Sequence, residues 1–399
     1  MTTIQHTIES AVSGAVKALY GMDLPADQVT VNATRKEFAG HYTVVTFPFT
    51  RAARKKPEQI GEELGAYLLD QLEDVSEFNV VKGFLNLTVA DGFWHKYLLA
   101  NFADRDFGRA PRRDEKVLVE FASPNTNKPL HLGHVRNILL GWSAGRILDA
   151  AGYDVTKVQI INDRGIAICK SMLAWQRFGE GATPQSTDTK PDHFVGDYYV
   201  AFETRFRAEY KQWQESPAGQ TVYAEKAKDD QDAADFFKGY KNTYFNEYSD
   251  LGRAAKAMLL RWEAGDEETT ALWQKMNGWV YEGFAATYER LGVSFDKLYY
   301  ESNTYLLGKD MIERGLEKEV FFTKEDGSTW VDLTDAKMDE KAVLRSDGTS
   351  LYITQDLGTA RLRYDDFGVN KMVYVVADEQ NYHFQVLFEV LKRLEEPYA

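Results

Sequence analysis

Two histidines lie close together in residues 123–137, which read SPNTNKPLHLGHVRN. They are His131 and His134, and Lys128 precedes them in the same stretch. An apolar run with helical periodicity follows, so we expect both imidazoles in the first turn of a helix. Free N–H groups at a helix N-terminus attract phosphate, and the imidazoles and the ammonium add donors toward charge that develops on phosphorus. The spacing predicts a site for attack on the α-phosphate of a nucleotide.

Gly133 lies between the two histidines and fits this prediction, but the histidines also allow other interpretations. Gly133 has no Cβ, so we expect it to let a flat ligand such as adenine lie against the backbone. The two histidines could instead be capping or core residues. Histidines at this spacing could also share a metal ion, but no Cys or Glu nearby completes a ligand set, and we expect no protein-bound metal.

A strand and a loop have to position this helix. KVLVEF (116–121) is typical of a short apolar strand, ASPNTNKP forms a loop, and the helix runs to Gly152. VTKVQIIN (155–162) follows as a second strand. Strand, helix and strand in this order predict a βαβ unit of a parallel sheet, in which ligands bind at the carboxyl edge.

The rest of the chain surrounds this unit. Residues 1–112 alternate helical and strand patterns, and a charged stretch at 103–116 is typical of a linker. Residues 170–345 are acidic and aromatic with helical patterns, and a second half resumes with TSLYITQDLGTA (349–360), expected as a strand leading into a helix. We therefore predict an α/β protein: a Rossmann-type parallel-sheet domain at 113–399 with a largely helical insertion at about 170–345, preceded by a small α+β domain at 1–112.

The composition of the chain argues against several classes of protein. The net charge of −14 speaks against a large nucleic-acid surface, although TRAARKKP (50–57) could contact phosphates or be a solvated loop. Cys169 is the one cysteine, which excludes a disulfide framework and suits a reducing compartment. No run of 18 apolar residues occurs, and the first residues lack the pattern of a signal peptide. We expect a cytoplasmic monomer without membrane contact.

Several stretches together resemble one family. VEFASPNTNKPLHLGHVRN (119–137) resembles the signature of class I aminoacyl-tRNA synthetases in its arginyl form, and INDRGIAICKSM, LRSDGTSLYITQDLGTA and DEQNYHFQVL continue the likeness. The resemblance implies ATP-dependent activation of L-arginine to arginyl-adenylate and transfer to the 3′ end of tRNA-Arg. It implies Mg²⁺ on the ATP phosphates and an N-terminal domain that contacts the tRNA elbow.

The same resemblance implies which residues bind the substrates. Those expected to hold arginine are Glu120, Ser123, Asn125, Tyr352, Asp356 and Gln380. Those expected to contact ATP are His131, Gly133, His134 and His383, with His131, His134 and Lys128 in the catalytic role. Four alternatives stay open: Glu120 could bind the linker arginines, Asp356 could be a helix N-cap, Tyr352 could fill the core, and His383 could be structural.

Two parts of the family pattern are missing from the sequence. The KMSKS-type loop that binds ATP phosphates is absent, because AKMDEK (336–341) and NKMVYV (370–375) both precede the last expected helix. The helical anticodon-binding domain is absent as well. We therefore expect an N-terminal portion of a synthetase with weak or no activity. The alternatives are a class I synthetase for another amino acid and a non-catalytic tRNA-binding fragment.

Overall fold

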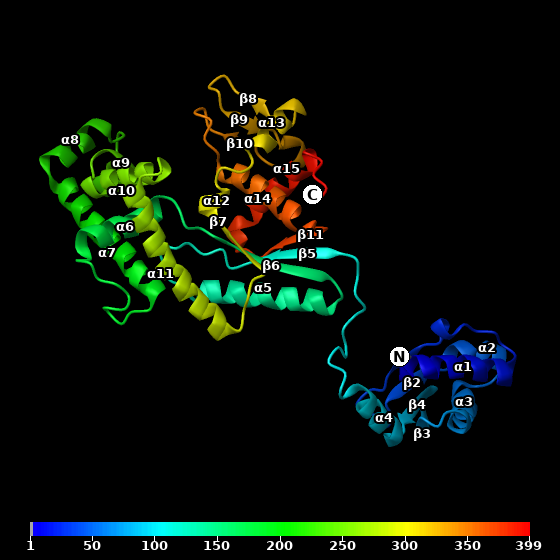
Figure 1. Ribbon diagram of the computed structural model, residues 1–399. Coiled ribbons are helices and arrows are strands. Elements are labelled where there is room, and N and C mark those ends of the chain that lie inside the picture. Colours follow the sequence, from blue (N-terminus) through cyan, green and yellow to red (C-terminus); the bar gives the residue numbers. More distant parts are fainter. Residues whose placement is uncertain (1–2) are drawn as a thin grey trace. The chain divides into compact units, whose positions relative to one another are not determined.

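The computed structural model describes residues 3–399 and divides into two compact units, residues 1–108 and 109–399. The first unit is an antiparallel sheet with helices packed on it (Figure 1, blue). Its strand order is β1-β2-β4-β3, with β1 at Val31–Ala33, β2 at Tyr42–Val45, β3 at Val75–Val81 and β4 at Phe84–Val89. Its helices are α1 (Ile4–Tyr20), α2 (Thr50–Ala53), α3 (Pro57–Gln71) and α4 (Asp91–Asn101).

Local sequence accounts for this unit. Ile4, Ile8 and Val12 recur at helical spacing on α1 and are buried. Lys82 and Gly83 both have positive φ, which is the backbone of a two-residue hairpin turn between β3 and β4. The basic stretch at 50–57 forms α2 and the turn into α3.

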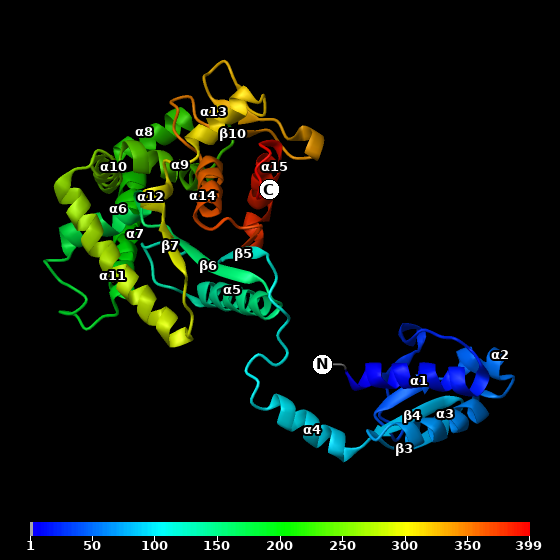
Figure 2. The same cartoon turned by 45° about the vertical axis from the view of Figure 1, so that its right-hand side comes forward.

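The second unit is built on a four-stranded parallel sheet with the order β11-β5-β6-β7. The strands are β5 (Lys116–Glu120), β6 (Asp154–Ile161), β7 (Lys297–Tyr300) and β11 (Lys371–Tyr374). Helix α5 (Leu132–Ala150) connects β5 to β6 and completes the predicted βαβ unit. Figures 1 and 2 show α5 on one face of this sheet and the helices α14 (Tyr352–Phe367) and α15 (Asn381–Arg393) on the other. The parallel Rossmann-type class is confirmed.

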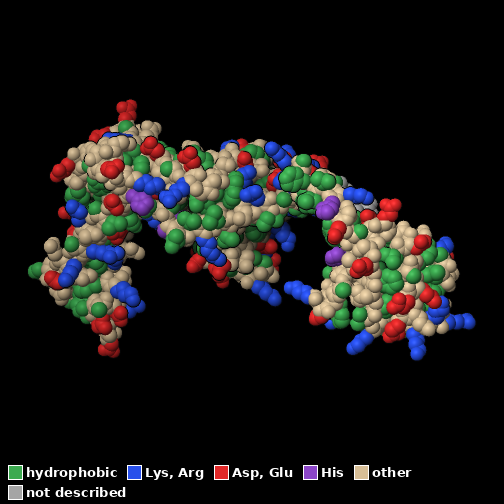
Figure 3. All heavy atoms as spheres, turned by 90° about the horizontal axis from the view of Figure 1, so that it is seen from below, with side chains coloured by type: hydrophobic (Ala, Val, Ile, Leu, Met, Phe, Trp, Pro, Cys, Tyr) green, Lys and Arg blue, Asp and Glu red, His purple; other side chains and the backbone are tan. Residues whose placement is uncertain are grey.

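Helix α5 sits close against the sheet. A Cβ on Gly141 would lie 2.2 Å from Phe121, so only glycine allows this approach. The outer side of α5 is exposed, with hydrophobic and basic side chains interspersed on the face seen in Figure 3; its exposed apolar residues include Leu139, Leu140 and Ile147.

A helical insertion follows β6. Its helices are α6 (Ile166–Phe178), α7 (Pro191–Glu215), α8 (Pro217–Lys226), α9 (Ala233–Glu247), α10 (Asp250–Glu263) and α11 (Glu267–Leu291). Stacked aromatic rings such as Phe206 and Tyr210 fill its core. The insertion ends before β7, because β7 pairs with β6 in the parallel sheet. The predicted limit near residue 345 is therefore too late.

A small antiparallel sheet separates β7 from the last two helices. It has the order β10-β9-β8, with β8 at Phe322–Thr323, β9 at Thr329–Val331 and β10 at Lys341–Leu344. The helices around it are α12 (Glu301–Thr304), α13 (Lys309–Glu317), α14 (Tyr352–Phe367) and α15 (Asn381–Arg393). Within residues 3–399, no helix is long and apolar enough to cross a bilayer.

The predicted strand at the start of residues 349–360 is wrong, because α14 already begins at Tyr352. Ile353, Leu357 and Ala360 are buried at helical spacing on α14 and pack with the core residues of α15. A short apolar run does not distinguish a strand from the buried face of a helix, and here tertiary packing decides for the helix.

Candidate functional site

The loops at the carboxyl ends of the parallel strands are tied to one another. The loop after β5 meets the loop after β6 at an isolated parallel bridge between Asn125 and Asn162. The side chain of Asn137 on α5 accepts from the Ala122 N–H at 2.7 Å and donates to the Val375 carbonyl at 2.6 Å. One amide thus joins the ends of β5 and β11 to α5. Ligands of open α/β sheets bind at this edge.

His131 and His134 cap the N-terminus of α5. His131 is the N-cap residue, and its Nδ1 accepts from the Gly133 N–H at 3.1 Å. The backbone N–H of His131 donates to Nδ1 of His134 at 3.2 Å, and the ring centroids are 3.9 Å apart. Because both Nδ1 atoms accept, both neutral rings carry their proton on Nε2. The capping interpretation therefore holds, and it leaves two Nε2–H donors.

His134 stays neutral at physiological pH. Burial lowers the pKa of His134 to about 4, and the neighbouring His131 and the Lys128 ammonium act in the same direction. A neutral imidazole next to a lysine offers a hydrogen-bond donor without the desolvation cost of a second full charge.

The structure gives a local reason for a glycine at position 133. A Cβ at this position would lie 2.9 Å from Cε1 of His131, so the glycine makes room for the capping ring. Its contact with a nucleotide base stays a prediction.

Tyr352 and Asp356 lie one helical turn apart on α14, so their side chains share a face. Tyr352 is 76% exposed, which rules out a core-filling role. The N-cap of α14 is Leu351, so Asp356 is not the helix cap. Instead its Oδ2 lies 2.6 Å from Nε2 of His383 on α15. Asp356, which is predicted to bind arginine, is thus paired with His383, which is predicted to contact ATP.

Glu120 ends β5 and is almost fully buried. Its Oε2 lies 2.6 Å from a guanidinium nitrogen of Arg363, and its Oε1 accepts from the Ser123 hydroxyl at 2.9 Å. Arg363 itself lies between the rings of Tyr299 and Tyr374, 5.5 Å from each centroid. The expectation that Glu120 could bind the linker arginines is wrong: its partner is an arginine of α14.

The remaining predicted residues lie at the same edge. Asn125 is exposed in the loop after β5, and Lys128 is half-buried just before α5. Gln380 is exposed at the start of α15, in the short turn Asp378–Gln380 that follows β11. Their contacts with substrate stay predictions.

Glu301 is a candidate that the sequence reading missed. It follows β7 directly, and burial and the charges of Asp163 and Asp356 raise its pKa to about 7, while Arg164 opposes them. A carboxylate after the apolar run LYY was the available signal. This run lies within residues 170–345, which the sequence pattern predicts as part of the helical insertion.

The histidine pair has no metal-binding neighbours in this structure. Within residues 3–399, no group of three or more His, Cys, Asp or Glu side chains is arranged to hold a metal ion.

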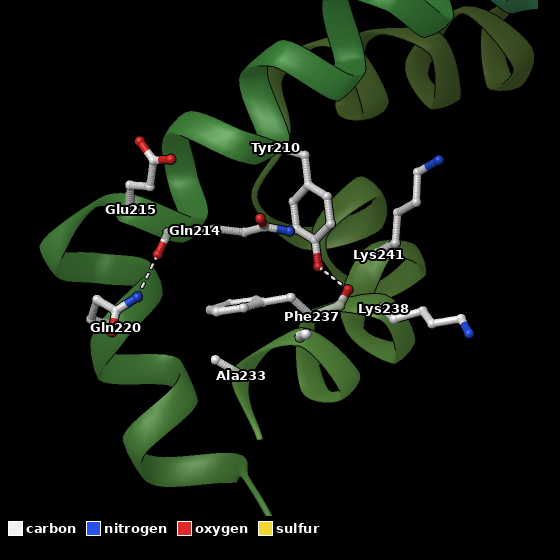
Figure 4. A pocket seen from close by; sticks show the side chains of 9 residues that line it. Tyr210, Gln214, Glu215, Gln220, Ala233, Phe237, Lys238 and Lys241 are labelled. Atoms are coloured by element: carbon white, nitrogen blue, oxygen red, sulfur yellow. Dashed lines mark hydrogen bonds between the residues drawn. The ribbon is translucent and has the colours of Figure 1, made fainter. Parts of the chain in front are cut away.

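A hollow of about 550 Å³ lies elsewhere, in the helical insertion (Figure 4). It is lined from α7, α8 and α9 by residues that include Tyr210, Gln220, Phe237 and Lys241. The Tyr210 hydroxyl donates to the Phe237 carbonyl at 2.5 Å and so links two residues that line it. None of the predicted site residues is among the described residues that line it.

Two family models match this chain. The model of the tRNA synthetases class I (R) catalytic domain matches residues 98–399. The model of the arginyl tRNA synthetase N terminal domain matches residues 3–89.

Individual relatives agree with these models. The chain is 50% identical over 393 residues to the arginine--tRNA ligase of Parabacteroides distasonis and 51% identical over 393 residues to that of Bacteroides fragilis. Each alignment covers 98% of this chain and 62% of the relative, so the chain spans less than two thirds of their length. The solved Thermus thermophilus arginyl-tRNA synthetase has the same fold, with a TM-score of 0.57, 22% identity and coverage of 99% of this chain and 64% of that one.

Proposed function

Because this chain belongs to the arginine branch of the class I tRNA synthetases, we propose that it binds L-arginine and ATP and carries the groups that activate arginine for transfer to tRNA-Arg. In this reaction an arginine carboxylate oxygen attacks the α-phosphorus of ATP. The bond from that phosphorus to the bridging oxygen breaks, and pyrophosphate leaves.

The observation that carries the proposal is the pair of carboxylates on Asp356 and Glu301, close enough for the charge of one to raise the pKa of the other. A guanidinium presents planar N–H donors with a permanent charge, which carboxylates accept. Arginine at this edge would bring its own positive charge between them. It would also offset the burial and the neighbouring carboxylate charges that together raise the pKa of Glu301.

We propose that Tyr352 and Glu120 also take part in arginine binding. The exposed Tyr352 phenol lies on the same helix face as Asp356 and can contact the guanidinium. Glu120 already binds Arg363 and Ser123, so its share in arginine binding would be through the remaining lone pairs. Ser123, Asn125 and Gln380 would hold the amino and carboxylate ends of arginine.

ATP would lie against the N-terminus of α5. His131 and His134 offer Nε2–H donors, Lys128 offers a point charge, and His383 lies close to this edge through its pair with Asp356. These donors would bind the phosphoryl oxygens more strongly in the transition state, where their charge is greater. Mg²⁺ would arrive bound to the ATP phosphates, whose oxygens are suitable ligands. Among the described residues, no group of three or more His, Cys, Asp or Glu side chains is arranged to bind it.

Binding of arginine and its neutral analogue tests the proposal. We expect calorimetric titration to show L-arginine binding, with L-citrulline, which replaces the guanidinium by an uncharged group, weaker by about thirtyfold or more. L-lysine tests whether charge without the planar fork suffices. Equal affinity for arginine and citrulline, or no arginine binding by a folded chain, would contradict the proposal. Arginine-dependent exchange of pyrophosphate into ATP then tests activation.

A further inference from the structure

Asp163 is a buried carboxylate outside the set of predicted site residues. It lies in the loop after β6 and is 1% exposed. Its Oδ2 accepts from the hydroxyls of Tyr281 and Ser302, each at 2.8 Å, and its Oδ1 accepts from the Ser302 N–H at 2.8 Å. Burial raises the pKa of Asp163, while these donors counteract the shift.

The carbonyl of the same residue holds the helical insertion. It accepts from the Trp273 ring N–H at 2.6 Å and from the Asn277 side chain at 3.1 Å. Trp273, Asn277 and Tyr281 are spaced by one helical turn each, so they form one face of α11. Asp163 thus fastens three successive turns of α11 to the carboxyl edge of the sheet.

The other partner of Asp163 leads to the proposed arginine site. Ser302 follows Glu301 in the short helix α12, so the two hydrogen bonds to Ser302 fix the backbone that carries Glu301. The charged groups that face Glu301 are Asp163 and Arg164 from the loop after β6 and Asp356 from α14.

Two of these neighbours are themselves held in place. Arg164 lies 3.9 Å from the ring centroid of Tyr305 and pairs with Glu263 of α10 at 2.7 Å. Asp356 pairs with His383 of α15. The surroundings of Glu301 are thus fixed from the insertion as well as from the sheet.

We propose that Asp163 is a positioning residue that fixes Glu301 at the guanidinium site and joins that site to α11 of the helical insertion. The inference rests on the proposed arginine function. It adds a definite route: displacement of α11 shifts Asp163, Ser302 and then Glu301.

Three variants test this role. Asp163→Asn keeps the shape and can still accept from the Ser302 N–H, but it removes a negative charge beside Glu301. Asp163→Ala removes every side-chain bond, and Ser302→Ala removes one of them. Asp250→Asn, at an exposed position of α10, is the matched control.

The first readout does not depend on arginine. Carbon-13 NMR of labelled glutamate, with the Glu301 signal assigned from Glu301→Gln, follows ionisation of that carboxyl. We expect its midpoint to move to lower pH in Asp163→Asn and to stay in place in Asp250→Asn, because only the first loses a facing charge. An unchanged midpoint in folded Asp163→Asn would overturn the inference.

The second readout is the affinity for arginine at about pH 8, where Glu301 is ionised. We expect Asp163→Ala to weaken arginine binding by about tenfold, with Asp163→Asn recovering most of the loss and ATP affinity kept in both. If Asp163→Ala does not fold, Ser302→Ala, expected to weaken binding in the same direction, decides. Variants that bind arginine like the parent would overturn the inference, whereas a parent that binds no arginine but shows the NMR shift would overturn only the proposed function.

Discussion

At the scale of single residues, the carboxylates at the sheet edge differ in their partners. Glu120 has a permanently charged internal partner, Arg363. Asp356 lies beside the imidazole of His383, and burial raises the pKa of Glu301 to about 7. An incoming cation can therefore bind Asp356 and Glu301 without breaking the buried pair of Glu120 and Arg363.

Asp356→Asn tests this ranking. The change keeps the shape and replaces an acceptor oxygen by a donor that faces other donors. We expect the affinity for arginine to fall by about thirtyfold or more, since truncating a charge-paired partner costs about 2–5 kcal/mol. ATP binding should be kept. Calorimetry measures both, and Asp365→Asn, on the exposed side of the same helix, is the control. Unchanged arginine affinity would remove Asp356 from the site.

Arg363→Met tests the buried pair. It leaves Glu120 in an apolar setting without its partner, so we expect the free energy of unfolding to fall by about 3–5 kcal/mol. Urea denaturation measures the loss. Arg253→Met, in an exposed pair with Asp250, should change it by about 1 kcal/mol or less. In the double variant with Glu120→Gln much of the loss should return; no recovery would mean that the cost is one of packing.

The raised pKa of Glu301 predicts a pH dependence of stability. The folded state holds this proton more tightly than the unfolded chain, so the stabilisation is complete below the ordinary glutamate pKa and is lost as pH rises through about 7. Relative to Glu301→Gln, we expect the parent to lose about 1 kcal/mol between about pH 6 and pH 8. Denaturation curves of both proteins at the two pH values measure it. Parallel behaviour would show that Glu301 ionises normally.

At the scale of elements, the sequence predicts some parts better than others. The helix α5 and its neighbours β5 and β6 are predictable, because capping histidines, apolar strands and Gly152 mark their ends within a short span. β7 is not, because its partner β6 is more than a hundred residues away in sequence and the strand has only four residues. Glu301 was missed with it. The pairing of Glu120 with Arg363 also depends on tertiary contact between distant elements, which spacing alone does not reveal.

The N-terminus of α5 allows capping and ligand binding to be separated. His131→Asn provides another good N-cap, so we expect stability within about 0.5 kcal/mol of the parent, whereas His131→Ala should lose about 1 kcal/mol. Both variants lack the Nε2–H donor, so ATP affinity should fall in both. Thermal denaturation and nucleotide titration give the two quantities. If His131→Asn bound ATP like the parent, the ring would serve only as a cap.

At the scale of the whole molecule, the segment between the units has two different halves. Its second half is fastened to the end of α5: Arg112 pairs with Asp149 at 2.8 Å, and the Arg113 N–H donates to the Gly152 carbonyl at 2.8 Å. Residues 102–108, by contrast, are exposed turns after α4. The predicted linker at 103–116 therefore includes a stretch that belongs to the second unit.

Limited proteolysis tests this division. We expect trypsin to cut first after Arg105, which is exposed in the turn segment. The separate unit of residues 109–399 has its own core and sheet, so it should bind arginine with the affinity of the whole chain. Mass spectrometry of the fragments and calorimetry of the purified unit check the two statements. First cleavage within 109–113, or loss of arginine binding, would contradict them.

The single cysteine reports how often the helical insertion opens. Cys169 on α6 is 3% exposed, and burial together with the nearby Glu263 raises its pKa to about 12. Its thiolate is therefore almost absent while the insertion stays closed, so a thiol reagent can modify it only during opening events. The rate of that modification counts how often the helical insertion opens. Because α10 and α11 pack on α6 and also hold the loop beside Glu301, a ligand at the sheet edge should slow the modification of Cys169.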